Sequence, residues 1–424
     1  MPQLWGSKMR RSQLFIKTRK DAPADETAKN AQLLIRAGFV HKEMAGVYVF
    51  MPLGLKVLEN IKQIVREEMD AVGGQEVQMT VLQPKEIFEK TDRWDDAKVD
   101  NWFKTKLVNG TELGMGLTHE EPIVDMLSDY LNSYKDLPVL VYQIQTKFRN
   151  ELRAQAGLLR GREFTMKDMY SFSKSQDEHE KVYEDVASAY ARVFDRLGIG
   201  DITYRTYADG GIFTERFSDE YQMLSEIGED TIYVDEDRKL AVNKEVIDDK
   251  RLDDTDIDKS RLTEKKAIEV GNIFPLESKY TDALGVYYTD QDGSQQKIIA
   301  GCYGIGISRL MGALAEHFAD DKGLVWPENV APAQVYLARL GEDAEVTVAA
   351  DDLYKKLQGQ GVELLYDDRD VRPGEKFADA DLMGIPYRVV VSAKTLEQQK
   401  VELKKRTEEQ AELVSVDDLL ANFS

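Results

Sequence analysis

Apolar residues recur at two different spacings along this chain, and each spacing predicts one type of secondary structure. Helical spacing over 55–69 and again over 180–197 predicts two amphipathic helices. Alternation of apolar with polar residues predicts strands over 139–148 and 164–170. We expect these strands to belong to an antiparallel sheet, with the polar loop 150–161 between them.

Two changes in composition predict domain boundaries. Residues 235–266 carry many charges and few apolar side chains, so we interpret them as a short acidic insertion without a large core. A second boundary falls near residue 331, because beyond it strands alternate with helices as in a small α/β domain. We therefore expect a first domain in two parts, 1–234 and 267–331, and a C-terminal domain over 332–424.

Several shorter elements are predicted within these parts. Residues 76–82 are expected to form a strand, and a glycine-rich passage over 298–317 is expected to run from a strand into a helix. Proline prefers the first helical position, so we expect a helix to begin at Pro122. The C-terminal domain is expected to contain strand 335–338, helix 344–357, strand 362–366, helix 377–383 and strand 387–391.

The composition excludes several classes of protein. The 56 Lys and Arg against 77 Asp and Glu give a net charge of −21, which argues against binding nucleic acid over the whole surface but not against one local basic surface. A single cysteine, Cys302, and four histidines argue against disulfides and a zinc site and favour a reducing cytoplasm. No apolar run reaches the roughly 18 residues of a membrane span. We expect the basic residues 1–20 to be part of the fold rather than a cleavable leader.

Three groups of residues can carry chemistry. In the first, Arg149 and Glu151 lie two apart at the end of a predicted strand, and Phe164 begins the returning strand. An arginine can bind a phosphate through paired donors, and a carboxylate can accept a hydrogen bond from an exocyclic amine. The phenylalanine offers a stacking surface to a planar base. The same residues fit an ordinary surface ion pair on a hairpin equally well.

The second group is the glycine-rich segment 301–309, GCYGIGISR, which ends in Arg309 at the start of a predicted helix. Glycines let the backbone approach a ligand closely, and an arginine at a helix N-terminus favours phosphate. The spacing matches neither a Walker A loop nor a dinucleotide fingerprint. Alone, such a run often indicates only close packing of a helix on a sheet.

The third group is THEEP at 118–122. It fits a helix capping box with Thr118 as the cap. If the helix begins at Pro122 instead, Thr118 and Glu120 can face a pocket and bind a hydroxyl-tolerant or cationic ligand group. His119 is expected to be packed rather than catalytic.

Together and in this order, these groups resemble the three motifs of class II aminoacyl-tRNA synthetases, and most closely those of bacterial-type prolyl-tRNA synthetases. The resemblance runs from near Met9 past Val391, which is nearly the whole chain. The segments that carry it are RNELR at 149–153, REFTMKDMYSF at 162–172, EVGNIF at 269–274, GCYGIGISR at 301–309, Trp326-Pro327 and DDRDVRPGEKFADADLMGIP at 367–386.

The resemblance implies an α+β catalytic domain built on an antiparallel sheet, followed by an α/β anticodon-binding domain, in a cytoplasmic homodimer. It implies that ATP and L-proline form prolyl-adenylate and pyrophosphate, and that proline then passes to tRNA(Pro). Mg²⁺ would neutralise the phosphates, and no zinc is implied. Such a reaction depends on positioning and on stabilising charge, so it requires no nucleophilic side chain.

The resemblance also implies a role for each candidate residue. The expected catalytic residues are Arg149, at the α-phosphate and the prolyl carboxylate, and Arg309, at the γ-phosphate. Glu151 would accept from the adenine amine, Phe164 would stack on adenine, and Glu269 would contribute to binding ATP and Mg²⁺. Proline binding is expected from Thr118, Glu120, Arg149, Asn272 and Cys302, with Glu120 at the secondary ammonium and Cys302 against the ring. Binding of tRNA is expected from Arg153, Arg160, Arg369, Arg372 and Lys376.

This sequence departs from the family pattern at several points. Thr80 stands where motif 1 carries a proline near the dimer interface, and Asn272 stands where the family usually has histidine. Many bacterial prolyl enzymes carry a large editing domain between motifs 2 and 3, where this chain has only its acidic insertion. A proline site cannot strongly exclude the smaller alanine, yet we expect no editing of alanyl-tRNA(Pro) by this chain.

Two other interpretations remain open. A threonyl or glycyl synthetase belongs to the same class, although the threonyl enzyme uses a zinc site that this histidine-poor chain hardly supplies. A non-catalytic synthetase paralogue would act as a binding or regulatory protein. Such paralogues tend to lose the phosphate-binding arginines or the tRNA domain, whereas Arg149, Arg309 and the C-terminal domain are all present here.

Overall fold

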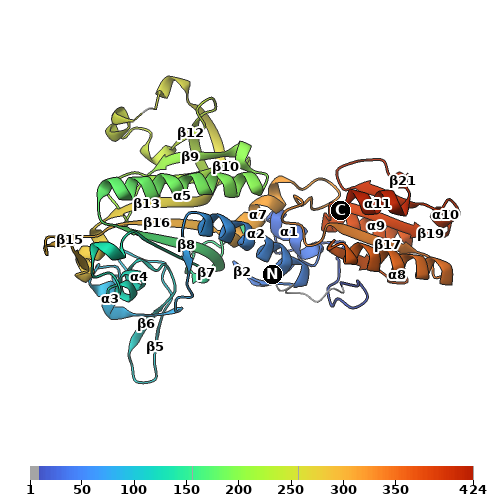
Figure 1. The fold of residues 1–424 in the computed structure, drawn as a ribbon, viewed down its shortest axis with the longest axis horizontal. Helices are drawn as coiled ribbons and strands as arrows, with labels where there is room; N and C mark the ends of the chain where they lie inside the picture. Colours follow the sequence, from blue (N-terminus) through green and yellow to red (C-terminus); the bar gives the residue numbers. More distant parts are fainter. Residues whose placement is uncertain (1–8, 155, 256, 424) are drawn as a thin grey trace. The chain divides into compact units, whose positions relative to one another are not determined.

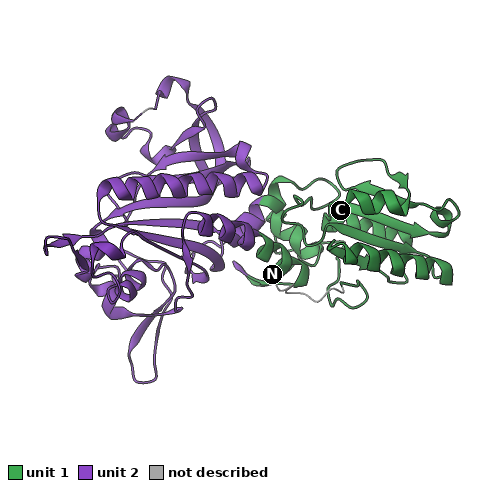
Figure 2. Ribbon diagram, in the orientation of Figure 1, with its two compact units in different colours: residues 1–44, 48–60, 314–424 green, residues 45–47, 61–313 purple. Residues whose placement is uncertain are grey.

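A computed structural model describes residues 9–154, 156–255 and 257–423. The chain forms two compact units (Figure 2). Residues 45–47 and 61–313 form the large unit, and residues 1–44, 48–60 and 314–424 form the C-terminal unit. The domain boundaries predicted at 234, 266 and 331 divide the chain differently from these two units, and they stay a prediction.

A nine-stranded sheet, ordered β10-β9-β12-β11-β13-β16-β8-β7-β3, forms the centre of the large unit (Figure 1). Its strands are β3 Gln75–Glu76, β7 Val139–Phe148, β8 Glu163–Ser173, β9 Thr203–Ala208, β10 Ser218–Leu224, β11 Asp230–Asp235, β12 Leu240–Asn243, β13 Thr263–Glu277 and β16 Ile299–Gly306. The pairs β7–β8, β8–β16 and β16–β13 are antiparallel. The antiparallel pairing predicted for the two strands around loop 150–161 is therefore confirmed.

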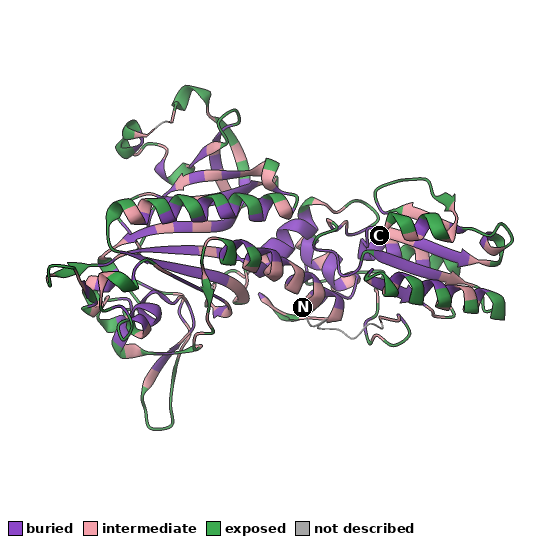
Figure 3. Cartoon of the chain, in the orientation of Figure 1, coloured by how far each residue is buried: buried purple, intermediate pink, exposed green. Residues whose placement is uncertain are grey.

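Helix α5, Gln176–Arg196, covers one face of this sheet (Figure 1). It begins after Ser175, whose side chain accepts a hydrogen bond from the Glu178 N–H and so caps the helix. Its apolar residues, among them Val186 and Val193, are buried at helical spacing, and its other side is exposed (Figure 3). The amphipathic helix predicted over 180–197 is confirmed and begins four residues earlier.

Two predicted helices contain residues of both units. Helix α2, Pro52–Ala71, confirms the helix predicted over 55–69, and α7, Ile307–His317, follows β16 directly, as the glycine-rich passage predicts. The other elements of the large unit are β4 Leu82–Pro84, α3 Lys85–Glu89, β5 Lys104–Lys106, β6 Glu112–Met115, α4 Glu120–Leu127, α6 Lys279–Leu284, β14 Tyr287–Thr289 and β15 Gln295–Lys297, with short 3-10 turns between them.

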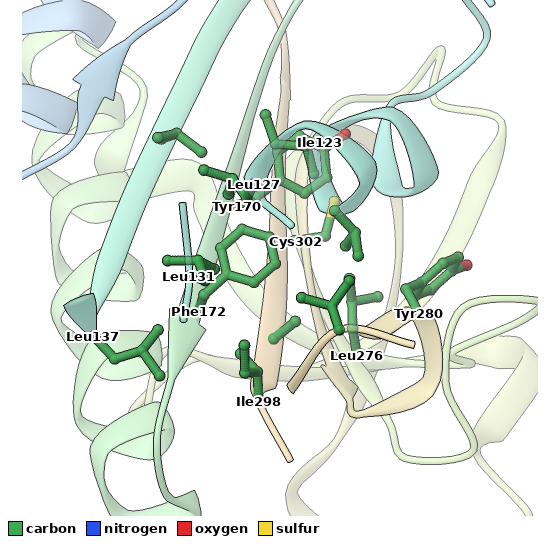
Figure 4. Close-up of a cluster of buried hydrophobic side chains, with 14 of the residues drawn as sticks. Ile123, Leu127, Leu131, Leu137, Tyr170, Phe172, Leu276, Tyr280, Ile298 and Cys302 are labelled. Carbon is green, nitrogen blue, oxygen red and sulfur yellow. The ribbon is translucent and has the colours of Figure 1, made fainter. Parts of the chain in front are cut away.

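A hydrophobic cluster joins α4 to the sheet (Figure 4). Ile123 and Leu127 of α4 meet Phe172 on β8 and Cys302 on β16, and each of these side chains is buried. The register pairs Cys302 with Tyr170, which lies in the same cluster. This packing fixes the first turn of α4 beside the centre of the sheet.

The C-terminal unit contains a five-stranded sheet, ordered β18-β17-β19-β20-β21. Its elements are β17 Val335–Leu340, α8 Ala344–Gly359, β18 Leu364–Asp367, α9 Pro373–Met383, β19 Tyr387–Ser392, α10 Ala393–Leu396, β20 Val401–Lys405, β21 Glu412–Val414 and α11 Val416–Asn422. The strand-helix order predicted for this part is confirmed. The unit also contains α1 Lys29–Arg36 and β1 Val40–Met44, and β1 pairs with β2 Val47–Phe50.

Two local predictions are wrong. Residues 76–82 do not form one strand, because side chains take the hydrogen bonds that a neighbouring strand would make. Gln143 accepts from the Met79 N–H at 3.3 Å, and Gln145 donates to the Met79 carbonyl at 3.0 Å. Helix α4 begins at Glu120 and not at Pro122. Proline is tolerated anywhere in the first turn, where the N–H groups lack helical partners, and acidic residues there are favoured by the helix dipole.

The acidic segment 235–266 contributes β12, which is parallel to β9, and the first residues of β13 to the large sheet. Around it lie short 3-10 turns and a small apolar cluster of Val242, Val246 and Leu252. The segment therefore packs on the large sheet and adds only a small group of apolar side chains.

Replacing Phe172 with alanine tests the cluster under α4. Phe172 is buried, so we expect the substitution to lower the free energy of unfolding by about 3–5 kcal/mol, because it leaves a cavity. Urea unfolding followed by circular dichroism measures this loss. Val108→Ala at the exposed tip between β5 and β6 is the control and should change stability by less than about 0.5 kcal/mol. Equal effects of the two substitutions would contradict the packing described.

Candidate active site

One cavity of about 200 Å³ in the large unit brings together residues from all three predicted groups. It lies over the ends of β7 and β8 and along β13 and β16, beside the first turn of α4. Its lining includes every residue predicted for ATP or proline, namely Thr118, Glu120, Arg149, Glu151, Phe164, Glu269, Asn272, Cys302 and Arg309.

Arg149 lies directly after β7 and over the ring of Phe164 on β8. The guanidinium carbon is 5.2 Å from the ring centroid, within the range of a cation–π contact. The Arg149 N–H donates to the Arg162 carbonyl at 2.9 Å, which extends the β7–β8 hairpin by one further pair. Burial, together with the nearby charge of Arg309, lowers the pKa of Arg149. Two cations placed so close to one another favour a polyanionic ligand.

Arg309 lies in the first turn of α7, where β16 ends. Its guanidinium donates to the Leu159 carbonyl at 2.9 Å and to the Glu269 carboxylate at 2.7 Å. These contacts hold the arginine at the cavity wall. Arg309 is thereby paired with Glu269, which the family resemblance also assigns to ATP binding.

The glycines before Arg309 serve two purposes. A Cβ at Gly301 would lie 2.5 Å from the Tyr303 hydroxyl, so this glycine is required by packing. Gly304 lines the cavity, and a Cβ there would meet nothing closer than the Asn272 carbonyl at 3.7 Å. Gly301 is therefore explained by packing, while Gly304 leaves room for a ligand to approach the backbone, which stays a prediction.

The carboxylate of Glu151 accepts from Arg160 at 2.9 Å, and Arg160 also pairs with Glu229 at 3.2 Å. Arg160 stays about half exposed at the cavity rim, and Arg153 is exposed in the loop before it. The polar loop 150–161 thus carries two exposed arginines beside the cavity.

Glu120 is a buried, hydrogen-bonded carboxylate of the cavity wall. It is only 1% exposed, and its two oxygens accept from the Thr118 hydroxyl at 2.7 and 2.6 Å. Arg93 donates to the same carboxylate at 3.0 Å and to Glu121 at 2.9 Å. The Cys302 thiol lies 3.3 Å away as a weak donor. One buried guanidinium therefore joins two neighbouring carboxylates of the α4 N-terminus.

The charges in this group are set by burial and by each other. Burial alone would lower the pKa of Arg93, but Glu121 and Glu120 raise it above its usual value. Burial alone would raise the pKa of Glu120, but Arg93 and the Thr118 hydroxyl lower it below its usual value. Burial and the charge of Glu120 raise the pKa of Glu121. Glu120 is therefore ionised at neutral pH.

The wall beside Glu120 is apolar. Phe213 and Phe274 line the cavity with ring centroids 4.7 Å apart, and Cys302 lies beside Phe274 on the paired strand. Burial, followed by the charge of Glu120, raises the pKa of the Cys302 thiol. The thiol therefore stays neutral and behaves as a small apolar group, not as a nucleophile.

A second buried network lies behind the Thr118–Glu120 segment. The Lys147 ammonium donates to Asp168 at 2.8 Å and contacts His119 Nδ1 at 2.6 Å, while His119 Nε2 faces the Thr80 carbonyl at 2.9 Å. Burial and the charge of Lys147 lower the pKa of His119 to about 4. His119 is thus neutral and packed, as expected, and it ties the segment to β7.

A second carboxyl group, that of Glu220, lies near Glu269 on one side of the cavity. Burial and the charge of Glu269 raise the pKa of Glu220 to about 8. The Asn272 amide nitrogen lies 3.5 Å from Glu269, and its oxygen is buried with no hydrogen-bond partner. Within the part of the chain that the structure describes, no three His, Cys, Asp or Glu side chains form a cluster that could hold a metal ion.

The cations expected to bind tRNA in the C-terminal unit differ in accessibility. Arg372 is exposed at the N-cap of α9, and Arg369 donates to Asp367 and Asp379 at 2.7 and 2.8 Å. Lys376 is only 2% exposed, and its ammonium donates to the Arg339 and Asp367 carbonyls. As the structure places it, Lys376 cannot reach a phosphate and instead holds the backbone of this region.

Two residues of this site, Arg93 and Phe213, lie in no motif that the sequence shows. Arg93 lies 27 positions before Glu120 in a segment without a recognisable motif, and no local pattern indicates its burial. Phe213 comes from an irregular segment between β9 and β10, and only the fold brings it against Phe274. Of this pair, Phe274 belongs to the quoted EVGNIF segment.

Comparison with known proteins agrees with this geometry. Residues 103–318 match the family described as tRNA synthetase class II core domain (G, H, P, S and T), and residues 334–424 match the anticodon binding domain. The chain is 38% identical over 427 residues to the proline–tRNA ligase of Wolbachia sp. subsp. Drosophila simulans, covering 98% of this chain and 100% of that protein. It is 39% identical over 440 residues to that of Rhizorhabdus wittichii, with the same coverage.

A solved structure described as Giardia lamblia prolyl-tRNA synthetase in complex with prolyl-adenylate shares the fold. It superimposes with a TM-score of 0.76 at 19% identity, covering 92% of this chain and 74% of that chain. The prolyl-tRNA synthetase of Cryptosporidium parvum complexed with L-proline and AMP gives 0.74 at 16% identity, covering 93% and 73%. The α+β sheet domain and the C-terminal α/β domain expected from the sequence are thus confirmed. The chain belongs to the prolyl-tRNA synthetase family of class II aminoacyl-tRNA synthetases.

Proposed function

We propose that this protein is a proline–tRNA ligase, which forms prolyl-adenylate from ATP and L-proline and then transfers proline to tRNA(Pro). The observation that carries the proposal is that one cavity contains two sites of opposite charge. Arg149 and Arg309 supply the positive charge for a polyphosphate, and the ionised, buried Glu120 supplies a negative charge for a secondary ammonium. The rings of Phe213 and Phe274, which pack against each other, offer an apolar wall to a pyrrolidine.

The residues of the cavity suggest how the reaction proceeds. Glu120 and Thr118 hold the ammonium, so that the prolyl carboxylate points toward Arg149 and the α-phosphate of ATP. Phe164 stacks on adenine, Glu151 accepts from its amine, and Arg309 holds the γ-phosphate. The carboxylate oxygen then attacks the α-phosphorus in line, and pyrophosphate leaves with its charge stabilised by the arginines. No protein nucleophile takes part.

Mg²⁺ bound to the phosphates of ATP fits the Glu269 side of the cavity. The Glu269 carboxylate lines the cavity and, after burial, contributes to the raised pKa of Glu220, so a divalent cation beside Glu269 would neutralise negative charge there. Magnesium commonly uses one or two carboxylates together with substrate phosphates and water, so Glu269 alone is a sufficient protein ligand. When bound, the ion would supply charge neutralisation of the phosphates.

Further aspects of the proposal rest on the family resemblance. We infer a homodimer in the cytoplasm, with tRNA(Pro) contacted by Arg153 and Arg160 near the cavity and by Arg372 in the C-terminal unit. Arg369 would act through its ion pairs with Asp367 and Asp379, which shape the same loop. In the described residues, no helix is long and apolar enough to span a membrane.

Proline-dependent exchange of pyrophosphate into ATP tests the proposed reaction. With separate additions of proline, alanine, cysteine and threonine, we expect strong exchange with proline and weaker exchange with alanine. Alanine lacks ring methylenes, and each missing methylene is worth only about 1–3 kcal/mol of discrimination. Exchange that depends on threonine but not proline, or no exchange from folded protein, would refute the proposal.

Replacing Glu120 with glutamine tests its role at the ammonium. The substitution removes the charge that faces the ligand, so KM for proline in the exchange reaction should rise by about 10- to 100-fold. KM for ATP should change less than KM for proline, because Glu120 is assigned to the proline ammonium and not to ATP. The control is Asp125→Asn, which removes an exposed carboxylate from the same helix and should leave both constants unchanged. An unchanged KM for proline in the Glu120 variant would contradict the assignment.

We propose further that the chain does not edit alanyl-tRNA(Pro). Only the segment 235–266, with β12, the first residues of β13 and a small apolar cluster, occupies the place of an editing domain. Incubating purified protein with alanyl-tRNA(Pro) should give deacylation at the rate of the buffer alone. Deacylation by the wild-type protein, abolished by deleting residues within 235–266, would show the opposite.

A further inference from the structure

The first described residues of the chain contact the C-terminal domain, more than 300 positions away in the sequence. We call residues 9–18 the N-terminal arm. The Arg11 N–H donates to the Tyr366 carbonyl at 2.7 Å, and the Tyr366 N–H donates to the Met9 carbonyl at 2.9 Å. The arm thereby pairs in parallel with β18, an edge strand of the five-stranded sheet. It satisfies polar backbone groups that an edge strand otherwise leaves open.

Side chains of the arm reinforce this pairing. The Arg10 guanidinium carbon lies 4.8 Å from the ring centroid of Tyr366 and 5.4 Å from that of Tyr354. Its nitrogens donate to Asp351 at 3.1 Å and to Asp368 at 3.3 Å. The Arg10 side chain is thus held by contacts with two aromatic rings and two carboxylates.

The arm also binds two carboxylates that flank one loop. Ser12 donates to Asp368 through its N–H at 3.0 Å and through its hydroxyl at 2.8 Å. Thr18 donates to Asp379 at 2.6 Å, and the buried guanidinium of Arg11 lies 3.5 Å from the same carboxylate. Asp368 belongs to the loop 367–372 between β18 and α9, and Asp379 belongs to α9.

The loop between these anchors carries exposed positive charge. Arg372 is exposed at the N-cap of α9, and Arg369 is held by Asp379, which the arm also contacts. The matched anticodon-binding domain begins at residue 334 and does not include the arm. The arm therefore adds to that domain a set of contacts with Asp368 and Asp379, beside Arg369 and Arg372.

We propose that the N-terminal arm is a positioning element for RNA binding by the C-terminal unit. Through Arg10, Ser12 and Thr18 it fixes loop 367–372, so that Arg372 meets the phosphate backbone of tRNA without first being ordered. A binding surface that is already ordered loses less conformational entropy on association, so it binds more tightly. The inference rests on the proposed function, because it takes tRNA(Pro) as the RNA.

Kinetics of the double variant Arg10→Ala, Ser12→Ala test the proposal. With a transcribed tRNA(Pro), we expect KM for tRNA in aminoacylation to rise about 10-fold, because two contacts to a charged carboxylate are lost. Proline-dependent pyrophosphate exchange, which needs no tRNA, should stay within about 2-fold of wild type. The matched control is Gln13→Ala, an exposed residue of the same arm, which should change neither constant.

Hydrogen exchange separates positioning from a purely structural role. The amides of residues 367–372 should exchange faster in the double variant, while those of β17 and β19 keep their protection. The single variant Arg10→Lys keeps the charge but not the planar fork. It should bind tRNA more weakly than the wild-type protein and more tightly than the double variant. If the double variant does not fold, the single variant Ser12→Ala gives the same test at an exposed side chain.

The proposal is overturned if KM for tRNA is unchanged in a variant whose loop amides exchange faster. It is also overturned if the exchange rates of the loop amides are the same in the variant and in the wild-type protein. Failure of the proposed function has a different signature. In that case the wild-type protein itself shows no proline-dependent exchange, whatever the arm variants do.

Discussion

The site depends on one buried guanidinium. Glu120 and Glu121 are adjacent carboxylates, almost completely excluded from water, and two such groups cannot both be ionised without a compensating cation. Arg93 provides that cation and contacts both. Because Arg93 and Thr118 lower the pKa of Glu120, the cavity keeps a negative charge in an apolar wall. A charge buried in this way attracts a ligand ammonium more strongly than an exposed carboxylate would.

The sheet holds this charge at the right distance from the phosphate-binding arginines. Antiparallel pairing of β7, β8, β16 and β13 places Arg149, Phe164, Cys302 and Glu269 along one surface, although they come from four strands. The hydrophobic cluster of Ile123, Phe172 and Cys302 fixes α4 against that surface. Positioning of the charges is therefore a consequence of strand register and of packing beneath α4. Substitutions in the cluster should therefore affect the site by shifting the positions of its charged side chains.

The strands and helices with a regular apolar pattern could be predicted from the sequence, and so could the residues in contiguous motifs. The pattern over 139–148 gives β7 with its bounds, and GCYGIGISR gives the strand-to-helix turn that carries Arg309. The sequence did not reveal what depends on contacts between distant segments. The pairing of Arg93 with Glu120, the side-chain hydrogen bonds that interrupt strand 76–82, and the burial of Lys376 are all tertiary effects. The arm on β18 belongs to the same group, because an isolated basic segment shows no partner in its own sequence.

The central claim is that an ionised Glu120 selects a ring that carries a secondary ammonium. Calorimetric titration of the wild-type protein with L-proline and with tetrahydrofuran-2-carboxylate tests it directly, since the second compound has the same ring and carboxylate with an ether oxygen in place of the ammonium. The account predicts that the ether analogue binds at least about 10-fold more weakly, because it offers Glu120 a lone pair instead of a charged donor. Equal affinities for the two compounds would contradict it.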